Sequence, residues 1–328
     1  MTDRAFAKER PPILVTGLAR SGTSWVGKML VASGELVYVN EPLNPQHPPG
    51  RSPGVLNADV THRYQYICAD NEDRWAAAFA DTVRLRYRPA AELRRNHRPY
   101  DLAHLVKYGT AFTAGRLLRR RALLDDPFAV LSAAWFAERL GCQVIACVRH
   151  PVAFIASRER LGWAVDLHAL LDQPLLLRDL LGPYTGDMRR LADSPDHIAR
   201  AALLWRMTYA TLAELAARLP ARVQVRRYED LATEPVPRFR ELYSVCGLTW
   251  TERAQGRVVA ATTGHRSASK SHVWSVRGGL SRTAFRPMDS AAALRSYQDR
   301  LTPAQIERVG ELTADVSKHY YDQSEGLG

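Results

Sequence analysis

The segment ILVTGLARSGTSW, residues 13–25, decides which fold the sequence predicts. A short apolar run leads into a loop bounded by Gly17 and Gly22, and the loop leads into a segment that begins as a helix. In such a loop the backbone N–H groups converge on an anion, with the N-terminus of the helix behind them. The spacing of the two glycines is that of loops that bind nucleoside triphosphates. The segment therefore predicts a phosphate-binding loop after the first strand of an α/β fold.

The loop departs from the nucleoside-triphosphate pattern directly after its second glycine. Thr23 stands where that pattern has lysine, Ser24 follows it, and the cation inside the loop is Arg20. A loop built for a phosphate-like group, with arginine inside it and hydroxyls after it, indicates a different nucleotide.

A second candidate anion motif is RHPVAFIAS, residues 149–157. The apolar run Gln143–Val148 is typical of a strand buried on both faces, and Arg149 stands at its carboxyl end. Ser157 comes eight residues later, in the helix expected over residues 152–161. Ligands of open parallel sheets bind at this edge, so both side chains can converge on one oxyanion. If Arg149 and Ser157 stood alone, we would interpret them as a helix-capping contact. Because they follow the phosphate-binding loop in the chain, we expect them to bind a ligand.

Together, these motifs resemble the donor site of sulfotransferases, which use 3′-phosphoadenosine 5′-phosphosulfate (PAPS) and release PAP. Residues 126–128 and 149–163 are more similar to the bacterial and carbohydrate-type branch than to the animal cytosolic branch. The resemblance implies that Arg149 and Ser157 hold the 3′-phosphate, that Arg20 and the loop amides neutralise charge on the leaving phosphate, and that no metal takes part. The donor-binding residues expected on this basis are Arg20, Ser21, Gly22, Thr23, Ser24, Trp25, Arg149, Ser157, Tyr228 and Arg277.

Three of these residues lie outside the core of the two motifs. Tyr228, in RYEDL at residues 227–231, resembles a tyrosine that lies near the adenine in the family. Trp25 stands where the family often has an aromatic residue beside the loop. Arg277, followed by two glycines, resembles a C-terminal contact to the 3′-phosphate, in the part of the chain where the similarity is loosest.

Glu41 is the expected catalytic base, because sulfuryl transfer to a hydroxyl requires a group that takes its proton. Glu41 follows the strand expected over residues 35–39, and we expect this strand to lie next to the phosphate-binding loop. Glu41 and Pro42 resemble the Glu-Pro that follows the loop in carbohydrate and tyrosyl-protein sulfotransferases. The choice among Glu41, Asp125 and a histidine stays open. The histidines in suitable places are His47, His104 and His150.

Alternating strands and helices predict a parallel sheet with helices on both faces, in a single domain over residues 1–328. We expect a helical insertion at about residues 55–125 and a cofactor and acceptor loop at about residues 262–287. Residues 128–140 are expected to form one helix, and the arginines of residues 116–121 to lie on a solvated helix face. Further helices are expected at residues 74–86, 201–219, 237–246 and 303–320, and a short strand at 223–225.

The net charge of +11, carried mostly by arginine, fits a polyanionic ligand. The four cysteines form no metal-binding or redox pattern, the N-terminus resembles no signal peptide, and no apolar run is long enough to span a membrane. These features predict a cytoplasmic enzyme. Its partner would be a small-molecule hydroxyl acceptor (a sugar, a phenol or a secondary metabolite), with neither nucleic acid nor membrane. The identity of the acceptor and the oligomeric state stay open.

Two alternatives come from other functional classes. A P-loop kinase or NTPase is disfavoured by Thr23 and by the apparent lack of a strand that ends in a metal-binding aspartate. A non-catalytic protein that binds nucleotides or nucleic acid through its basic charge would interleave aromatic and basic residues, and the sequence shows no such pattern.

Overall fold

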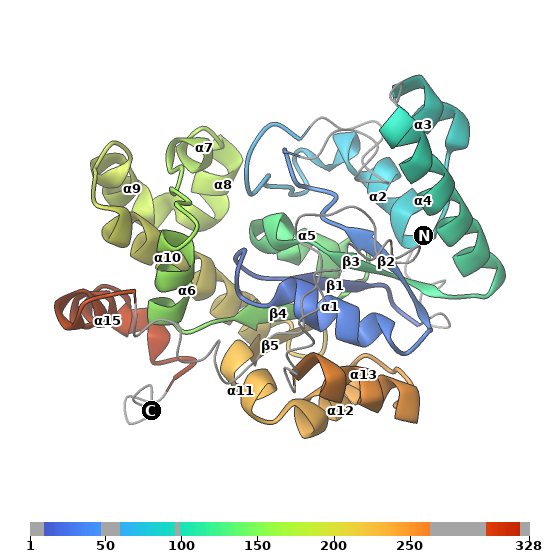
Figure 1. Ribbon diagram of the computed structural model, residues 1–328. Helices are drawn as coiled ribbons and strands as arrows, with labels where there is room; N and C mark the ends of the chain where they lie inside the picture. Colours follow the sequence, from blue (N-terminus) through green and yellow to red (C-terminus); the bar gives the residue numbers. More distant parts are fainter. Residues whose placement is uncertain (1–9, 47–59, 96–98, 263–299, 322–328) are drawn as a thin grey trace.

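A five-stranded parallel sheet forms the centre of the computed structural model, which describes residues 10–46, 60–95, 99–262 and 300–321 (Figure 1). The strand order is β2-β3-β1-β4-β5, and all four strand pairs are parallel. This confirms the predicted α/β class. The strands are β1 (Ile13–Thr16), β2 (Leu36–Asn40), β3 (Arg121–Asp125), β4 (Gln143–Val148) and β5 (Val223–Arg227).

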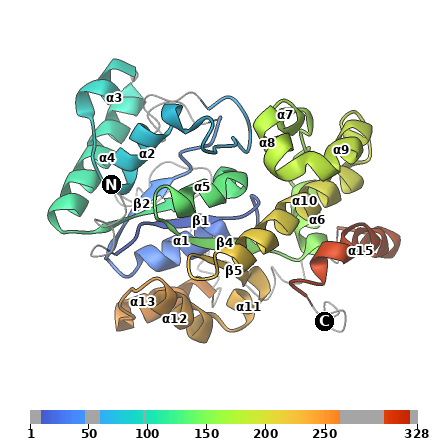
Figure 2. The same cartoon turned by 180° about the vertical axis from the view of Figure 1, so that it is seen from behind.

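Helices connect the strands and cover both faces of the sheet (Figures 1 and 2). The α-helices are α1 (Thr23–Val31), α2 (Ala76–Val83), α3 (Pro89–Arg95), α4 (Pro99–Leu117), α5 (Ala133–Glu138), α6 (Pro151–Glu159), α7 (His168–Leu171), α8 (Pro174–Leu176), α9 (Thr185–Leu191), α10 (His197–Arg218), α11 (Tyr228–Thr233), α12 (Pro235–Val245), α13 (Glu252–Thr262) and α15 (Pro303–Ser317). The short 3₁₀ and π segments are η3 (Glu72–Arg74), η4 (Pro127–Ser132), η5 (Leu177–Leu181) and η6 (Gly182–Tyr184).

Alternate residues of the strands face two separate apolar layers, as the pleat of a sheet requires. Ile13 and Val15 of β1 pack into the layer that α1, α11, α12 and α13 cover, whereas Leu14 packs into the layer of α2, α5, α6 and α10. Every residue of β1, β3 and β4 is buried. Two-sided burial explains why these strands are short, nearly continuous apolar runs.

The prediction for residues 116–121 is wrong at its end, because Arg121 begins the central strand β3. Arg116, Arg119 and Arg120 are exposed, as expected, but Arg121 is only 7% exposed. Its guanidinium donates hydrogen bonds of 2.7 Å to the carbonyl oxygens of Pro11 and Cys246. These bonds allow a charged residue to occupy a buried strand position, where the sequence pattern alone indicates a surface helix.

The helix predicted over residues 128–140 is divided into η4 and α5. The Asp126 side chain caps the first segment by accepting a hydrogen bond of 2.9 Å from the backbone N–H of Phe128. Pro127 starts a 3₁₀ turn that continues to Ser132, and the regular helix begins only at Ala133. The division leaves the chain after β3 close to the sheet edge.

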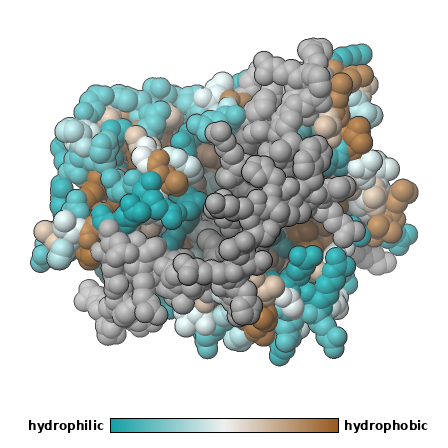
Figure 3. Space-filling model, in the orientation of Figure 1, coloured by the Kyte–Doolittle hydropathy of each residue, from teal (hydrophilic) through white to brown (hydrophobic). Residues whose placement is uncertain are grey.

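Between β2 and β3 lie the helices of the expected insertion, α2, α3 and α4, whereas residues 121–125 belong to the sheet. Apolar side chains gather on the outer surface at the α3–α4 side of the molecule, at the right in Figure 3. The exposed large apolar residues of α3, α4 and the turn after α4 are Leu93, Leu102, Val106, Leu117 and Leu118. A single domain over residues 1–328 stays a prediction, and the expected loop at 262–287 lies outside the described residues apart from Thr262.

We predict that Gly17→Ala lowers the free energy of unfolding by at least about 2 kcal/mol. Gly17 has φ 134°, and a Cβ at this position would lie 2.2 Å from the carbonyl oxygen of Cys147 in β4. Gly34→Ala is the matched control, because Gly34 also has a positive φ (81°) but open space around the Cβ. It should cost about 1–2 kcal/mol from backbone conformation alone. Urea denaturation measures both; equal losses would contradict the role of the contact with Cys147.

Candidate active site

The loop between β1 and α1 has three residues with positive φ, at Gly17, Arg20 (87°) and Gly22 (94°). The conformation is strained at Arg20, because a side chain rarely adopts it. At Gly22 a Cβ would lie 2.6 Å from the Tyr228 ring, so the glycine allows the tyrosine to pack directly against the loop. The loop and Tyr228, 206 positions apart in the chain, therefore form one surface.

One hydroxyl on α10 connects the loop to β4. The Tyr209 hydroxyl donates to the Cys147 carbonyl oxygen at 3.0 Å, lies 2.8 Å from Ser21 Oγ, and accepts from the backbone N–H of Leu18 at 3.4 Å. Because the single hydroxyl proton of Tyr209 is donated to Cys147, the Ser21 hydroxyl donates its own proton to Tyr209. Ser21, expected to contact the donor, is fully buried and is used here to hold the loop in place.

The two anion motifs meet in one cluster of side chains. Arg20 Nε donates to Ser157 Oγ at 3.2 Å, and Arg149 Nη1 donates to the Arg20 carbonyl oxygen at 3.2 Å. The Arg149 guanidinium also lies 4.7 Å from the centre of the Tyr228 ring. Burial lowers the pKa of the Arg20 guanidinium, and the positive charges of Arg160 and Arg149 lower it further. An anion bound here would relieve this repulsion.

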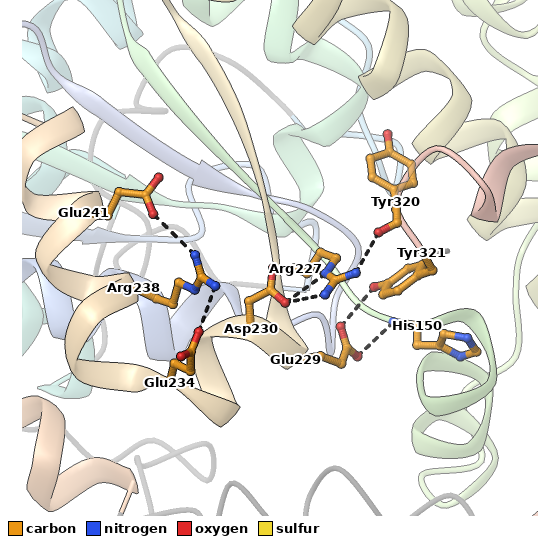
Figure 4. Close-up of polar contacts among 9 residues, drawn as sticks. All are labelled: His150, Arg227, Glu229, Asp230, Glu234, Arg238, Glu241, Tyr320 and Tyr321. Carbon is orange, nitrogen blue, oxygen red and sulfur yellow. Dashed lines mark hydrogen bonds and ion pairs between the residues drawn. The ribbon is translucent and has the colours of Figure 1, made fainter. Parts of the chain in front are cut away.

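The Arg149 backbone is held from behind by residues that sequence analysis did not identify. The indole N–H of Trp205 on α10 donates to the Arg149 carbonyl oxygen at 2.8 Å. Glu229 accepts hydrogen bonds of 3.0 Å from the backbone N–H of His150 and from the Tyr321 hydroxyl (Figure 4). Trp205 and Tyr321 lie outside the predicted motifs, and Glu229 lies in the RYEDL segment, from which only Tyr228 was expected to contact the donor.

Arg227 fastens β5 to the C-terminal segment in the same region (Figure 4). It pairs with Asp230 at the start of α11 and donates to the Tyr320 carbonyl oxygen at 3.1 Å. The contacts order the residues on either side of Tyr228. Tyr228 itself is 2% exposed.

Trp25 lies in the apolar layer behind the loop. Its side chain is 4% exposed and contacts the rings of Tyr228 and Phe239, with centroid distances of 5.7 and 5.2 Å. Its position supports Tyr228 from below. Arg277, the other outlying donor-site prediction, lies outside the described residues.

Glu41 follows β2, as predicted. The prediction that β2 lies next to β1, the strand that leads into the phosphate-binding loop, is wrong. β3 lies between β2 and β1. The Glu41 backbone has φ 45°, and its carboxylate accepts a hydrogen bond of 2.7 Å from Asn44 Nδ2. Burial raises the pKa of Glu41, the hydrogen bond from Asn44 lowers it, and the charge of Asp125 raises it.

Asp125 ends the intervening strand and is fully buried. Burial raises its pKa, and hydrogen bonds from Tyr38 and Ser24 oppose the increase. Asp125 is thus the carboxylate closest in the sheet order to the loop, and it contacts side chains of both α1 and β2.

The neighbouring Asp126 has a structural role. It is fully buried, and its two carboxylate oxygens accept from the backbone N–H groups of Leu43, at 2.7 Å, and Phe128, at 2.9 Å. These bonds fix the segment that carries Glu41 against η4. The hydrogen bonds to Asp126 therefore position the Glu41 turn.

The candidate histidines lie in different surroundings. His150 occupies the N-cap position of α6 without a capping hydrogen bond from its side chain, and its ring packs edge-on against Tyr321 at a centroid distance of 4.9 Å. Burial lowers the pKa of His150 to about 4, and the charge of Arg227 contributes. His104 lies on α4 beside Tyr108, and His47 is outside the described residues.

A family model described as "Sulfotransferase family" matches residues 11–252, which span both motifs and all five strands. The chain belongs to the sulfotransferase family. As expected for members of one fold, a sulfotransferase domain from the curacin biosynthetic pathway superposes with a TM-score of 0.50 at 14% identity, covering 93% of this chain and 98% of that one. No curated protein sequence matches the chain.

Two further sulfotransferase structures are similar over most of the chain. A domain of the Synechococcus PCC 7002 olefin synthase has a TM-score of 0.42 at 15% identity, covering 93% of this chain and 95% of the other. STF9 from Mycobacterium avium has a TM-score of 0.43 at 15% identity, covering 96% and 77%.

Family membership decides against the kinase or NTPase alternative. A strand next to β1 does end in an aspartate, Asp125, which the sequence pattern did not reveal. Among the described residues, no group of three or more His, Cys, Asp and Glu side chains is arranged to hold a metal ion. No helix within the described residues is long and apolar enough to cross a membrane.

We predict that His150 makes the sulfotransferase less stable as the pH falls. Its pKa is about 4 in the folded protein and 6.5 ordinarily, so between these values the unfolded chain binds more protons. Stability is therefore lost as the pH falls through this window, by up to about 3 kcal/mol. Urea denaturation at several pH values should show a shallower dependence for His150→Gln than for the wild type. Parallel curves for the two proteins would refute the assignment.

Proposed function

We propose that this sulfotransferase moves the sulfuryl group from PAPS to the hydroxyl of a small-molecule acceptor, by in-line displacement, and releases PAP. The observation that carries the proposal is the cluster of Arg20, Arg149 and Ser157 at the carboxyl edge of β1 and β4. Two buried or half-buried guanidinium groups that repel each other favour a ligand with several negative charges. PAPS carries such charges at both of its ends.

The chain's own residues fit this donor in a consistent way. The backbone N–H groups of Gly22, Thr23 and Ser24 would surround the 5′-phosphosulfate at the start of α1, since the hydroxyls of Thr23 and Ser24 bond Asp125. Arg20 would neutralise the charge that develops on the leaving phosphate. Ser21 would hold the loop in its binding conformation, because its hydroxyl is bonded to Tyr209 and its backbone N–H donates to the Leu18 carbonyl oxygen at 3.0 Å.

A second group of residues would bind the nucleoside end of the donor. Arg149 and Ser157 would hold the 3′-phosphate, and Tyr228 would lie near the adenine. Trp25 would act by supporting Tyr228 from the apolar layer. Arg277 remains a proposed additional contact to the 3′-phosphate. No metal ion is part of this mechanism.

Glu41 is the proposed base that removes the acceptor proton. Its raised pKa makes the carboxylate a stronger base than an exposed glutamate, and Asn44 orients one of its oxygens. Because β3 lies between β2 and β1, the acceptor would cross the end of β3 to reach the donor. Asp125 stands at that crossing but is held by Tyr38, which leaves Glu41 the better candidate.

The donor assignment predicts that PAP binds about ten- to a hundredfold more tightly than 5′-AMP. The physical reason is the charge-assisted contact of Arg149 and Ser157 with the 3′-phosphate, which 5′-AMP lacks. Isothermal titration calorimetry measures both ligands. Arg149→Gln should remove most of the difference, whereas Arg189→Gln, at an exposed arginine of α9, should preserve it. Equal affinity of the wild type for PAP and 5′-AMP would refute the donor assignment.

The base assignment predicts that Glu41→Gln lowers turnover by roughly 10²–10⁴-fold while PAP affinity stays within about twofold. Glutamine keeps the shape and the contact with Asn44 but cannot accept the proton. Sulfation is measured by mass spectrometry with PAPS and the best acceptor from a panel of sugars, phenols and alcohols. The wild-type rate should also rise with pH through the raised pKa of Glu41, because the carboxylate must be ionised.

The control for this experiment is the set of other candidate bases. Glu41→Gln should damage turnover more than His104→Gln, His150→Gln or Asp125→Asn, with stability measured in parallel for the buried aspartate. A fully active Glu41→Gln enzyme would exclude Glu41 as the base.

A further inference from the structure

A buried arginine on α6 has two guanidinium nitrogens without partners. The Arg158 side chain is 2% exposed. Its Nη2 donates to the carbonyl oxygens of Trp163, at 3.1 Å, and Ala164, at 2.9 Å. Its Nε and Nη1 are buried and have no hydrogen-bond partner in the parts of the chain that the structure describes. Since a guanidinium keeps its charge in proteins, this arrangement leaves a buried cation with donors to spare.

Arg158 faces away from the proposed donor site. Neighbouring residues of a helix point about 100° apart. Ser157 contacts Arg20 of the loop, whereas Arg158 contacts the turn that follows α6. The unpartnered nitrogens of Arg158 are therefore not explained by the 3′-phosphate.

A second arginine and three aromatic residues lie beside it. The Arg63 guanidinium is 5.5 Å from the centre of the Phe128 ring and 5.9 Å from that of Trp163. Tyr64 packs on Phe128 at 5.9 Å, and its buried hydroxyl forms no well-directed hydrogen bond with a described residue, although it lies within reach of the Arg158 guanidinium. Burial lowers the pKa of Arg158, the Tyr64 side chain raises it, and the charge of Arg63 lowers it further. We call Arg63, Tyr64, Phe128, Arg158 and Trp163 the Arg63–Arg158 cluster.

The Arg63–Arg158 cluster lies within electrostatic reach of Glu41. The positive charge of Arg63 lowers the pKa of Glu41 against the effect of burial, so the two side chains lie within electrostatic reach. Phe128 lies in the first turn of η4, whose cap Asp126 also binds the backbone of the Glu41 turn. The cluster therefore lies on the side of the site where the acceptor would enter, next to the proposed base.

We propose that the Arg63–Arg158 cluster binds an oxyanion, a carboxylate or a phosphate, that the hydroxylated acceptor carries. This inference rests on the proposed function, whose acceptor it narrows to anionic compounds. The oxyanion would accept hydrogen bonds from Nε and Nη1 of Arg158, from Arg63 and from the Tyr64 hydroxyl. Phe128 and Trp163, the latter 41% exposed, would contact the carbon skeleton.

Matched pairs of acceptor probes test the proposal. Hydroxyphenylacetate is compared with hydroxyphenylacetamide, which has nearly the same shape without the charge, and tyrosol phosphate is compared with tyrosol, which lacks the phosphate group. Calorimetry with PAP-saturated protein should show that the charged member binds roughly ten- to a hundredfold more tightly than its neutral partner. The carboxylate and phosphate pairs together show which oxyanion the cluster prefers.

Two variants assign the preference to the cluster. Arg63→Gln and Arg158→Gln should each reduce the ratio of the two affinities toward one, whereas Arg189→Gln on α9 should keep it. Arg158 also bonds the turn after α6, so its variant is checked for folding by circular dichroism. Arg63 is half-buried and bonds no backbone carbonyl among the described contacts, so its variant carries the test if Arg158→Gln unfolds.

The outcomes separate this inference from the proposed function. Equal affinity for the charged and neutral probes, including no binding of either, overturns it, as does a preference that survives in both variants. The titrations are repeated without PAP. If PAP does not bind, but the charged probe binds in a way that requires Arg63, the donor assignment fails and the oxyanion site stands.

Discussion

The close approach of the loop to β4 is the contact on which the rest of the site depends. The Gly17 backbone lies against the Cys147 carbonyl oxygen. The Tyr209 hydroxyl donates to that same oxygen and also forms hydrogen bonds with Ser21 and Leu18 of the loop. The loop is thus held by α10 and β4, which are remote in sequence. This attachment brings Arg20 within hydrogen-bond distance of Ser157 and allows Arg149 to reach the Arg20 carbonyl oxygen.

Charge is distributed unevenly along the carboxyl edge of the sheet. The arginines Arg20 and Arg149 follow β1 and β4, whereas Glu41 and Asp125 belong to the ends of β2 and β3. Sulfuryl transfer needs both kinds of group, because the donor is an anion and the acceptor must lose a proton. The strand order places the two arginines on the β1–β4 side of this edge and the two carboxylates on the β2–β3 side.

The site was predictable where its residues are close in sequence to a strand end. The loop and the Arg149–Ser157 pair are local patterns, since each follows one strand and continues into one helix. The contacts of Tyr209, Glu229 and Tyr321 were not predictable, because no local feature of the sequence marks the distant partner of a tyrosine or glutamate side chain. The same is true of Arg158, whose burial depends on the folding of residues 63–64 and 163–164 against it.

The sequence by itself determined the fold class, the phosphate-binding loop and the second anion motif, because apolar runs, glycine spacing and strand ends are properties of short segments. Only the tertiary structure decided the position of β3. The sequence pattern did not predict this strand, because it begins with a charged residue, Arg121. The Arg121 guanidinium donates hydrogen bonds to the carbonyl oxygens of Pro11 and Cys246, which are more than 100 residues away on either side. The insertion of β3 between β1 and β2 placed Asp125 beside the loop and moved Glu41 one strand further away, since strand order depends on contacts that no local pattern encodes.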